Sequence, residues 1–150
     1  SFYLRKMYLE NKLREPGGIE LGGVPIDLGR ITIPTFILST KEDHIAPWKA
    51  TFAATSLFKG PARFVLAASG HVAGVINPPA ARKYGYWTGP IEGEDPDRWL
   101  NSAVKHEGSW WTDWDDWNAA QSGEKVPARK PGGGKLVPLA DAPGTYVLSR

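Results

Sequence analysis

The fold prediction rests on two stretches, Asp43-His44-Ile45-Ala46-Pro47-Trp48 and Ser69-Gly70-His71-Val72-Ala73-Gly74-Val75. The first stretch follows an apolar, β-branched run at residues 31–38, and the second follows a shorter run at residues 63–67. Between them lies a segment with helical i,i+4 apolar pairs. A strand, a helix and a strand with short connections predict a βαβ unit with parallel strands. Both loops then leave the same edge of the sheet, where α/β proteins bind ligands.

The residue types at these two strand ends indicate acid–base chemistry. An acid after one strand and a histidine after the next is the order in which an α/β-hydrolase supplies the last two members of a nucleophile–acid–histidine triad. As a base, His71 would take a proton from a thiol or hydroxyl and return it to a leaving group, while Asp43 would orient its ring. The alternatives are a structural hydrogen bond for His71 and an Asx turn or helix cap for Asp43.

Composition excludes several other classes. The 150 residues are 41% hydrophobic and 23% charged, as in ordinary soluble globular proteins. A net charge of +2 is too small to indicate nucleic acid or an acidic membrane as a partner. The absence of cysteine excludes disulfides and thiolate metal sites. Three dispersed histidines make a weak metal site, so neither a metal nor a cofactor is predicted.

The fold class predicted is α/β: the C-terminal part of an α/β-hydrolase fold, with parallel strands and flanking helices, incomplete without upstream residues. Pro34 leaves open a start of the first strand after it. Residues 1–120 are assigned to this domain and residues 121–150 to a Gly/Pro/Lys-rich tail. The other predicted elements are an amphipathic helix at residues 2–14, a hairpin at 19–26, a loop at 85–93, a helix from 95 until Gly108, a short helix at 110–117 and an extended end at 145–148.

Two further histidines and the tryptophans each have a competing interpretation. His44 adjoins the acid, but neighbouring side chains at a strand end point apart, which favours a structural or interface role. His106 is predicted at the polar end of a helix, in solvent. Trp110, Trp114 and Trp117 could form a stacking platform for sugars or bases, but their helical spacing favours core packing.

Several motifs across essentially all 150 residues resemble the C-terminal part of polyhydroxyalkanoate synthases of the class I type. The most specific of them continues from His71 to Ile76-Asn77-Pro78-Pro79. The others are Ser1-Phe2-Tyr3-Leu4-Arg5, Asn11-Lys12-Leu13, Gly23-Val24-Pro25-Ile26-Asp27-Leu28, Asp43-His44-Ile45-Ala46-Pro47-Trp48, Gly108-Ser109-Trp110-Trp111 with Asp113-Trp114 and Trp117, and Ala142-Pro143-Gly144-Thr145-Tyr146-Val147.

The resemblance implies a catalytic domain that transfers (R)-3-hydroxyacyl groups from CoA to a growing polyester through an acyl-cysteine. By motif match, Asp43 and His71 are its catalytic aspartate and histidine. Asp43 would either tune His71 or help activate the attacking hydroxyl, and the sequence does not separate these two roles. Val72 and Ala73, which follow the base, are predicted to border the acyl pocket. The chain has no cysteine, so we expect it to be inactive by itself. The resemblance also implies a cytoplasmic, granule-associated homodimer that needs the remainder of the catalytic domain.

Two other hypotheses compete with the synthase. The chain could be the C-terminal part of a serine esterase or depolymerase, in which case the missing nucleophile would be serine. It could also be a non-enzymatic binding module built on the Trp-rich segment.

Overall fold

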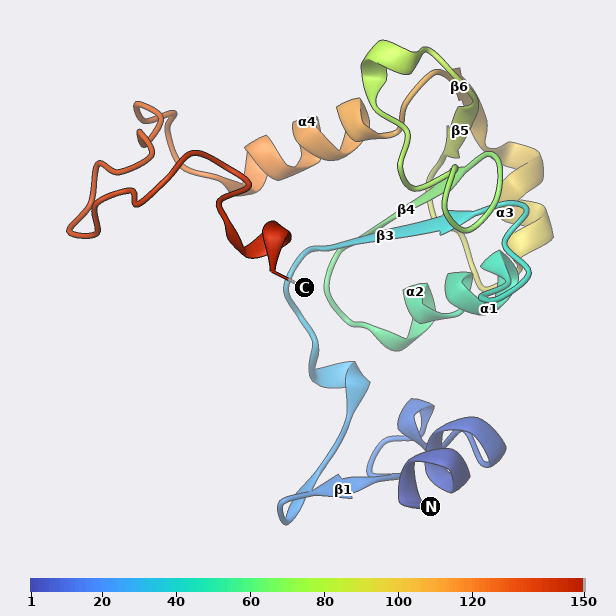
Figure 1. Cartoon of the computed structure of the whole chain (residues 1–150). Coiled ribbons are helices and arrows are strands. Elements are labelled where there is room, and N and C mark those ends of the chain that lie inside the picture. The colour runs from blue at the N-terminus through green and yellow to red at the C-terminus, as the bar shows by residue number, and fades with distance from the viewer. Residues whose placement is uncertain (150) are drawn as a thin grey trace. The chain divides into compact units, whose positions relative to one another are not determined.

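The computed structural model describes residues 1–149, and the contacts within it divide the chain into two compact units, Ser1–Asn118 and Ala119–Arg150. The first unit contains a four-stranded sheet with the order β3-β4-β5-β6 (Figure 1). The strands are β3 at Thr35–Thr40, β4 at Ala62–Ala67, β5 at Gly85–Thr88 and β6 at Val104–Glu107.

The predicted parallel strand pair is confirmed. β3 and β4 run parallel, with Thr35 opposite Ala62 and Thr40 opposite Ala67. β3 begins directly after Pro34, whose ring nitrogen cannot donate to a strand ladder. The sheet as a whole is mixed rather than parallel, because β5 is antiparallel to both β4 and β6. The structure is therefore an α/β fold whose parallel part is a single strand pair.

The connection from β3 to β4 runs through two short helices, α1 at Trp48–Phe52 and α2 at Ala54–Leu57 (Figure 1). Side chains alternate along β4, so that Phe64 and Leu66 share one core and Val65 and Ala67 another. The first core consists of aromatic and aliphatic side chains from strands and helices: Ile37, Trp48, Phe52, Phe64, Leu66 and Trp99. Burial on both faces explains why the sequence of β4 is apolar without alternation.

Two sequence predictions for the residues that follow β4 are wrong. The segment predicted as a loop at residues 85–93 begins with strand β5, and the helix predicted to continue to Gly108 ends early. That helix, α3, spans Pro96–Ser102, with the predicted cap: Asp95 accepts hydrogen bonds from the backbone of Asp97 and Arg98. The next residues form β6, because long-range pairing with β5 satisfies their backbone groups and outweighs local spacing.

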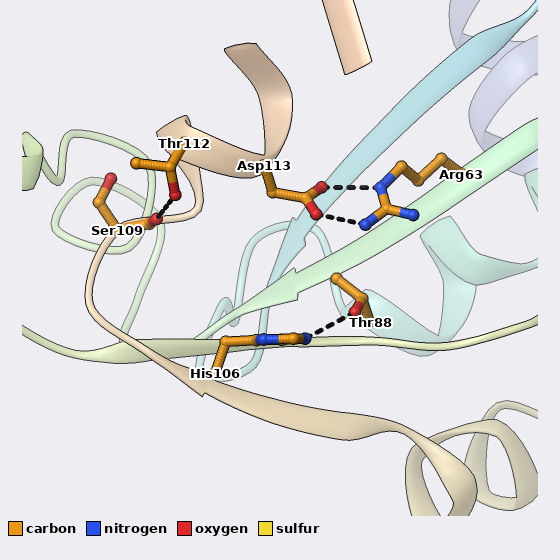
Figure 2. A network of polar contacts seen from close by, with 6 residues as sticks. All are labelled: Arg63, Thr88, His106, Ser109, Thr112 and Asp113. Atoms are coloured by element: carbon orange, nitrogen blue, oxygen red, sulfur yellow. Dashed lines mark hydrogen bonds and ion pairs between the residues drawn. The ribbon is translucent and has the colours of Figure 1, made fainter. Parts of the chain in front are cut away.

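His106 is consequently not solvated at a helix end. It lies on β6, opposite Tyr86, and its ring stacks on that of Tyr86 with 4.8 Å between centroids. Its Nε2 is 2.8 Å from Thr88 Oγ1 (Figure 2). This histidine joins two strands of the sheet and has a structural environment.

The N-terminal segment differs in part from its prediction. The helix predicted over residues 2–14 is interrupted at Asn11, which adopts φ +49°, a left-handed conformation that asparagine tolerates. A π-helix spans Leu4–Leu9 and 3₁₀ turns span Lys12–Arg14 and Leu28–Arg30. The predicted hairpin is confirmed as β1, Glu20–Leu21, paired with β2, Val24–Pro25.

Helix α4 at Trp111–Gln121 confirms the helix predicted around the tryptophans. Trp110 and Trp117 pack against Phe36, as the core interpretation predicts, but the side chain of Trp114 is 44% exposed. A 3₁₀ turn at Pro79–Ala81 precedes β5. The predicted extended end is wrong, since Tyr146–Leu148 forms a 3₁₀ turn. Within residues 1–149 no helix combines the length and apolarity required to cross a bilayer.

Candidate active site

The parallel register brings the two loops of interest to one edge of the sheet. Thr40 and Ala67 are opposite each other at the carboxyl ends of β3 and β4. Beyond these ends the loops stay joined, because the backbone N–H of Lys41 donates to the carbonyl of Ala67 at 2.8 Å and that of Glu42 donates to Ser69 at 3.0 Å. The backbone itself therefore places the segments that carry Asp43 and His71 side by side.

The predicted proximity of Asp43 and His71 is confirmed. His71 Nδ1 lies 2.8 Å from Asp43 Oδ2. The other carboxylate oxygen, Oδ1, accepts the backbone N–H groups of Ile45 at 2.8 Å and Ala46 at 2.9 Å. The Asx turn and the histidine contact, which were alternatives for Asp43, thus occur together, with one oxygen for each. The role of the pair in catalysis stays a prediction.

The surroundings of Asp43 favour its ionised form. The N–H of Ala46, the ring of His71 and the N–H of Ile45 lower the pKa of Asp43 to about 2. At neutral pH this carboxylate can only accept, so His71 Nδ1 carries the proton in the neutral ring. His71 Nε2 is then the free basic nitrogen. It has no hydrogen-bond partner in the described part of the chain, and the His71 side chain is 51% exposed.

Asp43 should make the stability of the fold depend on pH in the acid range. Its pKa is about 2 in the folded protein against an ordinary value of 3.8, so the ionised group stabilises the fold above about pH 4. That contribution is lost as the pH falls toward 2 and the carboxylate becomes protonated. We expect the difference in free energy of unfolding between the natural protein and Asp43→Asn, measured with urea, to shrink over this interval. A difference independent of pH from 5 to about 2 would contradict the assignment.

A close approach of backbone holds the turn that follows His71. The N–H of Gly74 donates to the carbonyl of Gly70 at 2.9 Å, and that of Ile76 to Val72 at 2.8 Å. A Cβ atom on Gly74 would lie 2.6 Å from the Ala68 carbonyl oxygen and 2.6 Å from the Thr40 side chain. Only glycine fits between the turn and the ends of the strands.

Three further candidates adjoin Asp43 or His71 in the sequence: His44, Val72 and Ala73. Val72 and Ala73 lie on the exposed side of the turn, with Val72 68% exposed, and their role in an acyl pocket stays a prediction. His44 is exposed and its side chain has no partner among residues 1–149. Over the same residues there is no group of three or more His, Cys, Asp or Glu side chains that could hold a metal ion.

Sequence reasoning missed the contacts that reach the histidine loop from the other end of the chain. The indole N–H groups of Trp110 and Trp111 donate to the carbonyls of Gly74 and Val75, each at 3.0 Å. Each pair is separated by 36 residues, and no local pattern signals such a bond.

The fold and the site define a class: an α/β protein in which two parallel strands present a carboxylate–imidazole pair at their carboxyl edge. No family model matches the chain. The chain is 48% identical over 151 aligned residues to the poly(3-hydroxyalkanoate) polymerase subunit PhaC of Cupriavidus necator. The aligned region covers 99% of this chain and 26% of that protein.

Two other relatives are also named as poly(3-hydroxyalkanoate) polymerases. Identity is 49% to the polymerase subunit PhaC of Rhizobium meliloti, over 100% of this chain and 24% of that protein. It is 50% to the poly(3-hydroxyalkanoate) polymerase of Methylorubrum extorquens, over 98% of this chain and 24% of that protein. The resemblance to polyhydroxyalkanoate synthases is thereby confirmed, and the chain spans about a quarter of the length of the curated relatives it matches.

Proposed function

We propose that this chain is the part of a poly(3-hydroxyalkanoate) polymerase that supplies the general base and its orienting acid. The observation that carries the proposal is the 2.8 Å contact between His71 Nδ1 and Asp43 Oδ2, on a chain that polymerases of this name match over nearly all its length. The rest of an α/β-hydrolase-type domain, including the nucleophile, would come from residues outside this sequence, which contains no cysteine.

The geometry suits acyl transfer from a thioester. His71 Nε2 would take the proton of a cysteine thiol, and the thiolate would attack the carbonyl carbon of an (R)-3-hydroxyacyl-CoA. The carbon–sulfur bond to CoA breaks, CoA leaves as a thiol with the proton from His71, and an acyl-cysteine remains. His71 would next take the proton of a hydroxyl, whose oxygen attacks the acyl-cysteine. The carbon–sulfur bond to the cysteine breaks, the new ester bond lengthens the polymer, and His71 returns the proton to the cysteine sulfur.

Asp43 would serve both half-reactions without gaining or losing a proton. Its carboxylate holds the Nδ1–H tautomer of His71 and stabilises the imidazolium formed when Nε2 takes a proton. In this proposal the chain alone is inactive, because its base has no nucleophile to activate. The proposed polymerase is a homodimer in the cytoplasm, at the surface of a polyester granule. Val72 and Ala73 lie beside the acyl group in this proposal.

The reaction products separate this proposal from its serine-hydrolase alternative. A full-length polypeptide containing this chain is supplied with (R)-3-hydroxybutyryl-CoA, and free CoA, polymer and free acid are measured. We expect CoA release to match hydroxybutyrate incorporated in polymer, and prior treatment with iodoacetamide to abolish both. Release of free acid that resists iodoacetamide but stops with a fluorophosphonate would identify a serine hydrolase and overturn the proposal.

A further inference from the structure

The loop that carries His71 receives two hydrogen bonds from the tryptophans at the start of α4. Trp110 Nε1 donates to the carbonyl of Gly74, and Trp111 Nε1 donates to the next carbonyl, that of Val75. Both distances are 3.0 Å, an ordinary length for an N–H···O bond. Two successive peptide groups of one turn are thus held by two successive side chains of another element.

The end of α4 that presents these indoles is itself tied to the same loop. Ser109 Oγ donates to the carbonyl of Asn77 and accepts the backbone N–H of Trp111 at 3.0 Å. The hydroxyl of Thr112 donates to the carbonyl of Ser109 at 3.1 Å (Figure 2). The serine therefore satisfies the backbone N–H of the first helical residue and joins it to the chain beyond His71.

The helix is also fixed to the sheet, so it can act as a rigid support. The Arg63 guanidinium, on β4, donates to both carboxylate oxygens of Asp113, with 2.7 Å between Nε and Oδ2 (Figure 2). The carboxylate raises the pKa of Arg63. The ring of Trp110 packs against that of Phe36 on β3, with 6.2 Å between the ring centroids. Strand β4 thus anchors α4 near its start and carries the His71 loop at its end.

The side chain of His71 has few contacts of its own. Its side chain is 51% exposed and its one side-chain hydrogen bond in the described residues is the contact with Asp43. Gly74 has no side chain with which to anchor the turn. The position of the imidazole therefore depends on the path of the backbone through Gly74 and Val75, and this is the backbone that the two indoles hold.

We propose that Trp110 and Trp111 are positioning residues for the histidine: their N–H groups hold the loop so that His71 Nε2 faces the nucleophile while Nδ1 stays on Asp43. The inference rests on the proposed function, in which His71 is the base. The indoles touch neither substrate nor reacting atoms. They act through the geometry of the loop, where a displacement of about 1 Å can lower a rate by about 10²-fold.

The decisive test removes the N–H and keeps the ring. In the full-length polypeptide, Trp110 is replaced by β-(3-benzothienyl)alanine, which has the shape of tryptophan with sulfur in place of N–H, and separately by 5-fluorotryptophan, which keeps the donor. We expect the benzothienyl variant to lose about 10- to 100-fold in kcat for CoA release with KM within about twofold, because substrate binding is unchanged. The fluorotryptophan variant should keep the natural kcat.

A second readout follows the histidine itself. We expect the Nδ1–H proton of His71, in its bond to Asp43, to give a downfield NMR resonance in the natural protein, and we expect the benzothienyl variant to shift or broaden that resonance. The matched control is Trp114→Phe, since Trp114 is also on α4 and its indole N–H has no partner within residues 1–149. This control should change neither kcat nor the resonance.

The outcomes separate the two proposals. If His71→Gln loses activity while benzothienylalanine at position 110 leaves kcat and the resonance unchanged, the positioning role is refuted and the proposed function stands. The same holds if benzothienylalanine changes only KM or thermal stability. If His71→Gln keeps near-natural turnover, the proposed function fails and the positioning role fails with it.

Discussion

Replacement of His71 by glutamine in the full-length polypeptide should lower the rate of CoA release by about 10²–10⁴-fold, the usual contribution of a positioned general base. Glutamine has a similar reach and can donate to the Asp43 carboxylate, but its amide takes up no proton near neutral pH. Both the activation of the thiol and the activation of the attacking hydroxyl would lose their base. The measurement is the initial rate of thiol appearance from (R)-3-hydroxybutyryl-CoA.

His44→Gln is the matched control for this substitution. His44 lies on the same edge of the sheet, is exposed and has no side-chain partner in the described part of the chain. We expect it to retain the natural rate, and we expect circular dichroism to show the same fold for both variants. A His71→Gln enzyme with near-natural turnover would refute the role of His71. A His44→Gln enzyme that lost activity equally would point to damage of the loop instead.

Asp43→Asn should reduce turnover by up to about 10⁴-fold, the effect seen when the acid of a Ser-His-Asp triad becomes an amide. The asparagine oxygen can still accept the N–H groups of Ile45 and Ala46, so the turn is preserved. The amide nitrogen then faces His71 Nδ1 as a donor. It therefore favours the tautomer with the proton on Nε2, and that nitrogen can no longer act as a base.

Glu42→Gln removes the same charge at the neighbouring position and is the control for this variant. The Glu42 side chain is exposed, and the loop depends on its backbone N–H, which substitution leaves in place. Asp43→Asn and Glu42→Gln enzymes are compared by kcat for CoA release at pH 7. Equal rates for the two variants would show that the carboxylate of Asp43 has no part in the reaction beyond its charge.

Local sequence was sufficient where the backbone and its nearest neighbours decide the structure. Pro34 sets the start of β3 because it cannot donate, and Asp95 starts α3 because its carboxylate satisfies free N–H groups. The strand that leads to His71 is apolar because both of its faces are buried. Its pairing with β3 then follows from the short connection between them.

The errors between residues 85 and 107 concern elements whose partners are distant in the chain. Residues 85–88 and 104–107 form strands because each completes the hydrogen bonds of a neighbour, β4 for the first and β5 for the second. Helical spacing at Leu100 and Val104 predicted a longer helix, since it contains no information about those partners. Because of this error His106 was predicted in solvent, whereas in the structure it contacts Thr88.

The residue types and their order are enough to identify the groups of the site: one carboxylate and one imidazole at the ends of two strands, on a chain without cysteine. The way in which these groups are held depends on contacts between distant parts of the chain. The register of the strands sets the 2.8 Å contact between Asp43 and His71, in which one carboxylate oxygen faces the ring and the other accepts backbone N–H groups. The indole bonds to Gly74 and Val75 depend on contacts between residues 36 positions apart. Local propensity acts over a few residues, whereas these distances are set by how the faces of the sheet are packed.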